Sequence, residues 1–278
     1  AFRVTYAPML PEVEHIAPPY CYRCFYELEY PACGLRCARA LEDAILSLGP
    51  DIVSAFLAET VSGATIAGAV PPPGYWPLIR SICDRYEVLL ILDEVMCGMG
   101  RTGSWFAYQD FGVKPDIVTL GKGLSGGSLP LSAVGVKGEL YDAVAASGGF
   151  VHGGTFSHHP VTAAAGVAAV NILEREKLVE RAGKMGKLLG NLLSERLGKN
   201  RHVGDIRGKG LLWGVEIVAD RKSRRPYPRS EKTVERLWRS LFENGVIVYL
   251  ASGLAGSDGD ALIVAPPFII KENELVEI

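Results

Sequence analysis

The stretch Val88-Leu-Leu-Ile-Leu-Asp93-Glu-Val95 opens with five apolar residues in a row, and an acid follows them. A strand that is apolar at every position is typical of a parallel sheet covered on both faces. Asp93 stands at the carboxyl end of this strand, which is where ligands of open α/β sheets bind. The stretch therefore predicts an α/β fold with a functional site beside Asp93.

The segments around this strand alternate between helix and strand patterns. A helix over residues 38–48 ends at Gly49-Pro50, because Gly accepts the C-terminal turn and Pro cannot continue a helix. A second helix opens at Pro77 with apolar residues on one face. Further strands are expected over residues 52–57, 117–120 and 132–136. This alternation favours a layered α/β architecture with a mainly parallel sheet.

The pattern changes after Pro160. Residues 161–197 are rich in helix formers, with breaks expected near Lys177 and Gly183. Strands are expected over 210–218 and 246–250, and an amphipathic helix between them ends at Gly245. The chain is therefore expected to divide into a domain over residues 1–175 and a smaller α+β domain over 176–278.

The composition excludes several classes of protein. Lys and Arg total 29 against 31 Asp and Glu, so a net charge of −2 provides no basic field for nucleic acid or an anionic membrane. No apolar run approaches the ~20 residues that span a bilayer, and residues 1–6 carry no apolar signal sequence. Six Cys in 278 residues do not form a secreted disulfide scaffold, so we expect a cytoplasmic protein.

A second strand end carries a lysine. Lys122 directly follows the strand expected over 117–120 and lies between Gly121 and Gly123. A partly desolvated lysine can lose its proton and become a Schiff-base nucleophile. A buried Asp93 in turn needs a cationic or hydrogen-bonded partner. The alternative is an ordinary salt bridge between two charges at strand ends.

Seven separated motifs surround these two residues. They are Ala58-Glu59, Pro71-Pro-Pro-Gly-Tyr75, Asp93-Glu-Val95, Gly98-Met-Gly-Arg-Thr-Gly103, Gly112-Val-Lys-Pro-Asp-Ile-Val-Thr-Leu-Gly-Lys122, Leu129-Pro-Leu131 and Gly154-Thr-Phe-Ser-His-His-Pro160. With them the chain resembles the class III (omega-type) aminotransferases, which are pyridoxal-phosphate (PLP) enzymes of the aspartate-aminotransferase fold (PLP fold type I). The order and spacing match over at least residues 51–175, and residues 208–216 continue the match.

The resemblance implies a role for each site residue. Lys122 would form a Schiff base with the cofactor aldehyde and later move a substrate proton. Asp93 would pair with the pyridine nitrogen, and Val95 would pack on the ring. Thr155 would contact the cofactor phosphate of the partner subunit in a homodimer. Glu59 would face the substrate or support the site from behind, because Thr60 replaces the usual Pro of the Glu-Pro pair.

Two glycine-rich patterns imitate nucleotide sites. Residues 98–103 satisfy G-x-G-x-x-G, but five residues separate them from the strand and no clear helix follows. Asp116 stands at the start of a strand, whereas the ribose-binding acid of such folds stands at the end of one. Gly123 occupies the place where a phosphate loop needs Ser or Thr. Neither pattern therefore predicts a nucleotide site.

The cysteines leave a metal site open. Cys21, Cys24, Cys33 and Cys37 have spacings compatible with a small zinc knuckle, although the gap between the two pairs is short for zinc ribbons. The other interpretation is four reduced thiols in a Tyr- and Pro-rich loop. No metal is assigned. His158 and His159 are adjacent and more readily shape the turn near Thr155 than bind a metal.

The chain departs from the family pattern in two places. Nothing upstream of Ala1 matches the N-terminal half that carries the phosphate-binding loop, so that half is apparently missing, and the chain stops at Ile278 within a helix pattern. In members that use α-carboxylates, an Arg stands three residues before the late Pro-Pro pair, where this chain has Ile263. Without that bidentate clamp, the pocket is expected to favour an amine or omega-amino acid.

The resemblance therefore implies an aminotransferase that moves an amino group to a keto acid such as pyruvate by a ping-pong mechanism. Two alternatives stay open: a PLP-dependent aminomutase or racemase, since the same residues serve those reactions, and a non-catalytic truncated relative.

Overall fold

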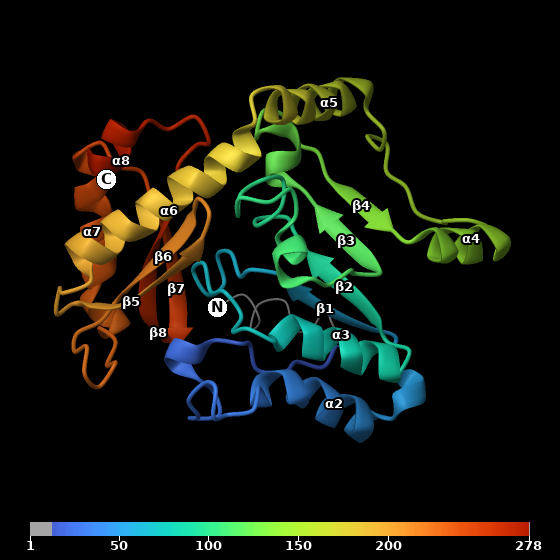
Figure 1. The fold of residues 1–278 in the computed structure, drawn as a ribbon, viewed down its shortest axis with the longest axis horizontal. Helices are drawn as coiled ribbons and strands as arrows, with labels where there is room; N and C mark the ends of the chain where they lie inside the picture. Colours follow the sequence, from blue (N-terminus) through green and yellow to red (C-terminus); the bar gives the residue numbers. More distant parts are fainter. Residues whose placement is uncertain (1–12, 278) are drawn as a thin grey trace.

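The computed structural model describes residues 13–277 and contains two four-stranded sheets side by side (Figure 1). Residues 1–6, which carry no signal pattern, and Ile278, the end of the expected helix, lie outside the described residues. Across the described part, none of the helices is long and apolar enough to cross a lipid bilayer.

The first sheet is mainly parallel, as expected. Its strands lie in the order β1 (Ala55–Glu59), β2 (Leu89–Asp93), β3 (Ile117–Leu120) and β4 (Ala133–Val136). The first three strands run parallel, and β4 pairs with β3 in the antiparallel sense. Ile52, expected to lie in the first strand, belongs instead to a 3₁₀ helix (Pro50–Ile52), because Pro50 starts a helical turn before the strand.

Two helices cover one face of this sheet. They are α2 (Arg36–Leu48) and α3 (Tyr75–Arg85), which pack together below the sheet in Figure 1. Leu90 and Leu92 of β2 are completely buried against them. Burying a Leu side chain stabilises a fold by about 1.5–3 kcal/mol. The apolar run in the sequence thus provides the core that holds the strand end at Asp93 in place.

The start of β3 is fixed by Asp116. Its carboxylate accepts hydrogen bonds from the backbone N–H of Leu90 (2.7 Å), from Arg80 (2.7 Å) and from Lys137 (2.5 Å). Burial alone would raise the pKa of Asp116, but these three donors outweigh it and hold the pKa below its usual value. Asp116 therefore has a structural role: it links α3, β2 and the residue after β4. This agrees with its place at the start of a strand, where no ligand-binding role was expected.

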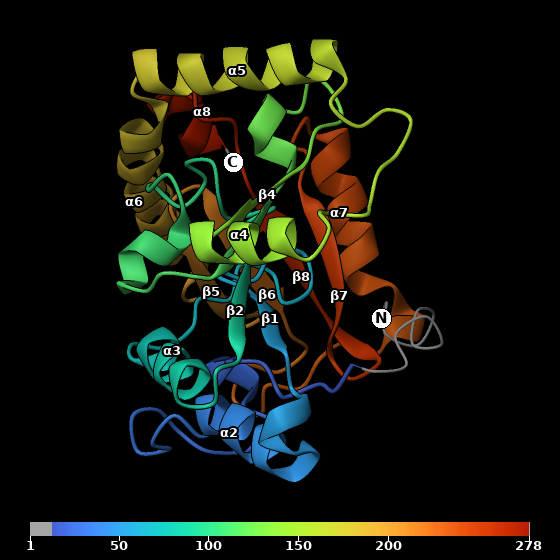
Figure 2. The same cartoon turned by 90° about the vertical axis from the view of Figure 1, so that its right-hand side faces the viewer.

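The second sheet is antiparallel and has the order β5-β6-β8-β7. Its strands are β5 (Val203–Lys209), β6 (Leu212–Ile217), β7 (Tyr249–Ala255) and β8 (Asp258–Val264). The sequence patterns predicted β6 and the start of β7 and missed β5 and β8. Helices α6 (Leu178–Leu197), α7 (Thr233–Glu243) and α8 (Glu272–Glu277) pack on one side of it (Figures 1 and 2).

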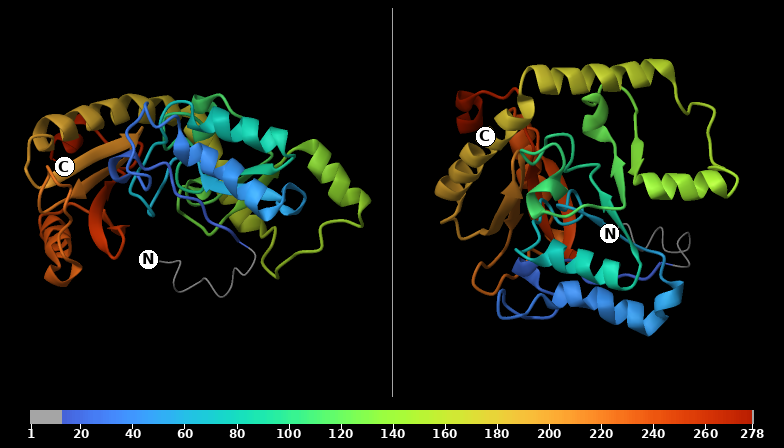
Figure 3. Two further views of the ribbon diagram at one scale, coloured as in Figure 1. Left: turned by 90° about the horizontal axis from the view of Figure 1, so that it is seen from below. Right: turned by 45° about the vertical axis from the view of Figure 1, so that its right-hand side comes forward.

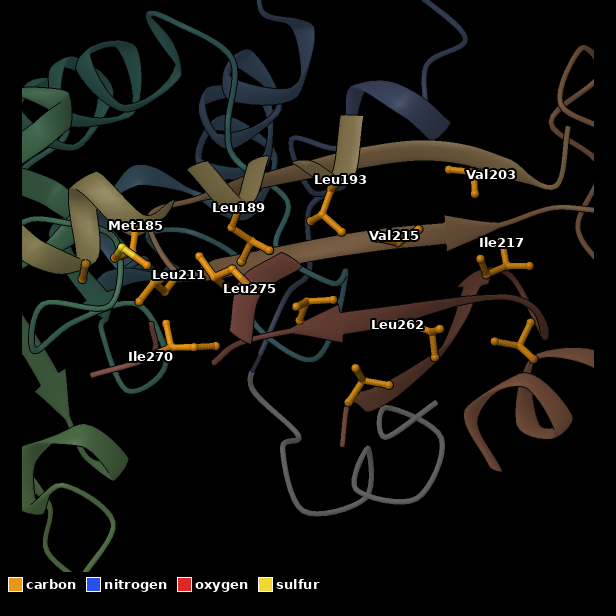
Figure 4. Close-up of a cluster of buried hydrophobic side chains, with 14 residues drawn as sticks. Met185, Leu189, Leu193, Val203, Leu211, Val215, Ile217, Leu262, Ile270 and Leu275 are labelled. Atoms are coloured by element: carbon orange, nitrogen blue, oxygen red, sulfur yellow. The ribbon is translucent and has the colours of Figure 1, made fainter. Parts of the chain in front are cut away.

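The core of this second unit lies between α6 and the sheet. Figure 4 shows Leu189 and Leu193 of α6 facing the strands that carry Val215 and Leu262. All four side chains are 6% exposed or less. This cluster is separate from the core beneath β2, which supports a division of the chain into two units; the boundary at residue 175 stays a prediction.

The predicted helix break at Gly183 is wrong, whereas the break at Lys177 is confirmed. Helix α5 (Pro160–Arg175) ends before Lys177, which takes a left-handed conformation (φ 51°), and α6 continues through Gly183. Gly183 lies against the backbone of Gly103, with only 3.5 Å from an added Cβ to the Gly103 Cα. Glycine serves here for close packing, and the helix tolerates its conformational cost of about 1 kcal/mol.

One part of the molecule stands apart from both cores. Helix α4 (Gly138–Ala146) has no buried residue and projects from β4 at the opposite end of the molecule from α7 (Figure 3). The segment between α4 and α5 is also exposed and carries Phe150, Val151 and Phe156, which are 78–96% exposed. None of the other residues in the range 13–277 covers these apolar side chains.

Candidate active site

Three strand ends bring the predicted site residues to one edge of the first sheet. Glu59 ends β1 and pairs in register with Asp93, which ends β2. Asp93 in turn pairs with Thr119 of β3, three residues before Lys122. The parallel direction of β1, β2 and β3 explains the juxtaposition, because their carboxyl ends share an edge.

Lys122 leaves the sheet in a strained backbone conformation. It begins a 3₁₀ helix (η5, Lys122–Ser125) with φ 42°, in the left-handed region. Such a conformation costs a non-glycine residue about 1–2 kcal/mol. The N–H of Gly127 donates to the Lys122 carbonyl at 3.3 Å and stabilises the turn. Nine other non-glycine residues of the described part share the left-handed conformation, so it agrees with a functional role for Lys122 but does not single it out.

Two cavities open beside this lysine. One has a volume of about 550 Å³ and the other of about 940 Å³, and both are lined by Lys122 and Val95. Val95 is half-buried, and its methyl groups lie 3.4–3.7 Å from where a Cβ of Gly121 would stand. The structure thus brings Lys122 and Val95 together on the surface of one concave region.

Asp93 supports this region from the adjacent strand. Its Oδ1 accepts a hydrogen bond from the Val95 N–H at 2.8 Å. No donor among residues 13–277 binds its Oδ2. One oxygen therefore fixes the side chain. Asp93 itself lines neither cavity, although Val95, to which it is hydrogen-bonded, lines both.

Glu59 turns away from the cavities. Its carboxylate accepts hydrogen bonds from Ser62 Oγ (2.9 Å), the Gly63 N–H (3.1 Å) and Thr65 Oγ1 (2.5 Å). Glu59 lines neither cavity. These contacts order the loop after β1, and the substrate-side role of Glu59 stays a prediction.

Thr155 lies in the exposed segment between α4 and α5 and also lines neither cavity. His158, three residues further on, has a left-handed backbone (φ 59°), and the His159 carbonyl accepts from Thr162 Oγ1 at 2.9 Å as α5 begins. The two histidines therefore shape this turn. Within a single chain, the structure keeps Thr155 away from Lys122.

The site contains one cation that the sequence analysis missed. Arg101, from the glycine-rich stretch 98–103, lines the larger cavity with Lys122. Its Nη1 donates to the backbone carbonyls of Leu211 (3.2 Å) and Pro266 (2.7 Å). Burial lowers the pKa of Arg101 to about 10, so the guanidinium is still charged at neutral pH. An arginine within a glycine motif, with no acid close in sequence, is the signal that could have identified it.

Ile263, at the place of the family's carboxylate-binding Arg, is 2% exposed in β8. It packs in an apolar cluster with Val61, Ala67 and Cys97. A carboxylate would lose its hydration there without gaining a partner. Neither the side chain of Ile263 nor the residues around it can therefore bind a substrate carboxylate.

The four cysteines of the knuckle-like spacing are thiols. Cys21 is exposed, Cys24 and Cys33 are half-buried, and Cys37 is buried. Burial raises the pKa of Cys21, and its neighbours Cys33 and Cys24 raise it further; burial raises the pKa of Cys37 to about 11. Within the described residues, no group of three or more His, Cys, Asp or Glu side chains is arranged to hold a metal ion.

Comparisons with known proteins agree on one family. The aminotransferase class-III family model matches residues 2–278. Similar proteins include a putrescine–pyruvate aminotransferase of Pseudomonas aeruginosa (36% identical over 97% of this chain) and a leucine/methionine racemase of Thermococcus litoralis (38% over 96%). The chain spans only 57–58% of the length of these relatives.

A solved structure shares the fold. The (S)-enantioselective omega-transaminase from Thermomicrobium roseum superimposes with a TM-score of 0.85 and is 39% identical. The match covers 94% of this chain and 57% of that one. The fold expected from the resemblance, with a mainly parallel sheet and a smaller α+β unit, is thereby confirmed.

Proposed function

The chain belongs to the class III aminotransferase family, and from this premise we propose that it transfers an amino group from an amine or omega-amino acid to a keto acid such as pyruvate, with pyridoxal phosphate as cofactor. The observation that carries the proposal is the placement of Lys122 and Val95 on shared cavities, next to the strand that ends in Asp93.

The residues present fit this cofactor. Class III aminotransferases depend on pyridoxal phosphate as a family. The larger cavity of about 940 Å³ is within the range of small-molecule sites, and Lys122 provides an amine for an aldehyde. The free Oδ2 of Asp93 matches a protonated ring nitrogen. Val95 provides an apolar surface beside them.

The chemistry follows from these side chains. Pyridoxal phosphate supplies an aldehyde for amines and a ring that takes up an electron pair. Lys122 would hold the cofactor through its amine, and its Nζ, when free, would move the proton at the substrate Cα. Asp93 would keep a proton on the ring nitrogen, and Val95 would set the tilt of the ring. The same Nζ would move the proton in the opposite direction when a keto acid takes up the amino group.

The substrate preference follows from Ile263. Because its surroundings offer no carboxylate partner, we expect turnover of β-alanine with pyruvate to exceed that of an α-amino acid such as leucine by about tenfold or more, the equivalent of about 1.4 kcal/mol. The putrescine–pyruvate relative supports an amine donor. Initial rates with each donor, measured on the same PLP-loaded protein, test this preference; faster turnover of leucine would contradict it.

The same assay separates the alternatives. A racemase or aminomutase would isomerise its amino acid with no keto acid added, a possibility that the racemase relative makes specific. A non-catalytic relative would be stable and would bind no cofactor even in excess. Transfer that strictly requires both donor and keto acid would exclude both alternatives.

A homodimer completes the proposal. The uncovered side chains of Phe150, Val151 and Phe156 form the kind of apolar surface that marks an interface, and we infer that a second copy covers it and receives Thr155 at its cofactor phosphate. We expect sedimentation at twice the chain mass of 29.9 kDa. Thr155→Val should weaken PLP retention about tenfold without changing that mass; a single-chain mass would argue against the dimer.

The six disulfide-free cysteines are compatible with the cytoplasm.

A further inference from the structure

The glycine-rich stretch 98–103 forms a close contact with the second unit of the fold. A Cβ on Gly100 would stand 2.9 Å from Val179 Cγ2, and one on Gly103 would stand 2.8 Å from the Gly183 Cα, both in α6. On the other side, a Cβ on Gly210 would stand 2.6 Å from the Arg101 carbonyl oxygen. At Gly103 and Gly210 the opposing backbone leaves no room for a side chain. We call this contact the glycine joint (Gly100, Gly103, Gly183 and Gly210).

Arg101 is the long side chain that crosses the glycine joint. Its own carbonyl accepts the Leu211 N–H at 2.9 Å, while its Nη1 donates to the carbonyls of Leu211 and Pro266. Its guanidinium also stacks on the ring of Phe268, 4.5 Å from the ring centre. Arg101 therefore holds two separate segments of the second unit, before β6 and after β8.

The charge of Arg101 has no partner of opposite sign. No carboxylate of the described residues contributes to its pKa, which burial alone lowers. Burying a cation without a carboxylate partner is unfavourable. The position of the Arg101 guanidinium is therefore not explained by an ion pair. Two backbone carbonyls and the face of an aromatic ring partly stabilise the positive charge of the guanidinium. The planar guanidinium of Arg101 thereby bridges two backbone groups.

The segment after β8 is a wall of the larger cavity. Ala265, Pro267, Phe268 and Ile269 line it together with Lys122. Arg181 of α6 holds the same wall from within the second unit, donating to the carbonyls of Phe268 (2.9 Å) and Ile270 (2.6 Å). Arg101 is thus the side chain that ties this wall to the strand end at Asp93 and Val95, through residues 96–100.

We propose that Arg101 is a positioning residue of the active site: by bridging the Leu211 and Pro266 carbonyls across the glycine joint, it sets the place of the cavity wall 265–269 relative to Lys122 and so limits the size of the amine that the cavity admits. The inference deepens the proposed function and rests on it in one respect: that the molecule admitted to the cavity is an amine substrate. The placement of the wall is independent of that function and can be tested separately.

The test compares Arg101→Lys and Arg101→Gln with Arg207→Lys as the matched control. Arg207 also links the two units, since its Nε and Nη2 donate to the Ile66 carbonyl at 3.1 and 2.9 Å, but it lines neither cavity. Hydrogen exchange should rise about tenfold in peptides 208–214 and 264–270 of both Arg101 variants. In Arg207→Lys, peptide 264–270 should exchange as in the parent; peptide 208–214 is compared only between the Arg101 variants and the parent, because Arg207 itself pairs with Gly214.

Access to Lys122 provides a second readout that needs no catalysis. Acetaldehyde and benzaldehyde each label the lysine amine in the presence of cyanoborohydride, which reduces the imine that forms with loss of water. In both Arg101 variants, the ratio of benzaldehyde to acetaldehyde labelling at Lys122 should rise about tenfold, and it should stay at the parent value in Arg207→Lys. In the PLP-loaded protein, the KM for a bulky amine should fall relative to the KM for β-alanine.

Each contrary result overturns the proposal. If Arg207→Lys changes the labelling ratio equally, the effect is general loosening between the units. If Arg101→Lys behaves as the parent, the positive charge matters and the bridging fork does not. Failure of amino transfer in the parent would refute the proposed function, and the exchange and labelling results would still decide whether Arg101 sets the wall.

Discussion

Lys122→Ala is expected to remove the visible absorbance band that the parent chain gives with pyridoxal phosphate and to lower amino transfer by at least about 10³-fold. The physical reason is that one side chain performs two tasks. Its amine anchors the cofactor, and the same Nζ moves the substrate proton, a task worth about 10²–10⁴-fold by itself. No other lysine lines either cavity among the residues that the structure describes, so no neighbour can replace it.

Lys114→Ala is the matched control, because Lys114 is exposed and stands just before β3, the strand that leads to Lys122. The control should keep both the band and the activity. A band of equal strength in Lys122→Ala would refute the assignment of Lys122. Absence of a band in the parent as well would show that the cofactor needs parts of the relatives' length that this chain does not span.

Asp93→Asn should lower turnover by about 10²–10³-fold while the visible band persists. Asn has the same size as Asp, and its Oδ1 can still accept the hydrogen bond that the Val95 N–H donates to Asp93 Oδ1 at 2.8 Å in the parent. The strand end should therefore keep its geometry. What is lost is the negative charge that keeps a proton on the ring nitrogen, and preorganised charges of this kind account for rate effects of that order.

The contrast with the lysine variant makes this second prediction specific. Lys122 is unchanged in Asp93→Asn, so the cofactor should still bind covalently and only the proton-transfer step should slow. Asp51→Asn, in an exposed 3₁₀ turn before β1, is the control for loss of one aspartate charge. Turnover within about threefold of the parent in Asp93→Asn would remove Asp93 from the proposed mechanism.

Much of the first sheet and the centre of the site could be predicted from local sequence. Strand β2 is a short apolar run that ends in Asp93, and Lys122 stands two residues after the end of β3. The expectation that the first run is covered on both faces is wrong for the described residues: α2 and α3 bury Leu90 and Leu92 on one face, and the residues on the other face are only half-buried. The direction of parallel strands then places their carboxyl ends together, with no further information needed.

The second sheet was predicted only in part. Strand β5 reads Val-Gly-Asp-Ile-Arg-Gly-Lys, and β8 begins Asp-Gly-Asp, so neither shows a continuous apolar run. Some of their polar side chains have partners far away in the chain, such as Arg207 of β5, which donates to the Ile66 carbonyl. Glu216 of β6, for example, is buried and accepts from Arg23 (2.5 Å) and from Arg207 (2.8 Å) of β5. Patterns of local hydrophobicity cannot show such pairs.

Local sequence thus places Lys122 and Asp93 at strand ends, because backbone hydrogen bonding and burial of an apolar run act between near neighbours, and their roles in the site stay predictions from the family resemblance. The folded chain alone shows that Glu59 binds its own loop, that Thr155 lies away from the cavities, and that Gly183 continues a helix. It also shows Arg101 holding a cavity wall more than 160 residues further along the chain. The places of Gly183 and Arg101 depend on which distant backbones come within 3–4 Å of each other, and that is settled only when the two units pack.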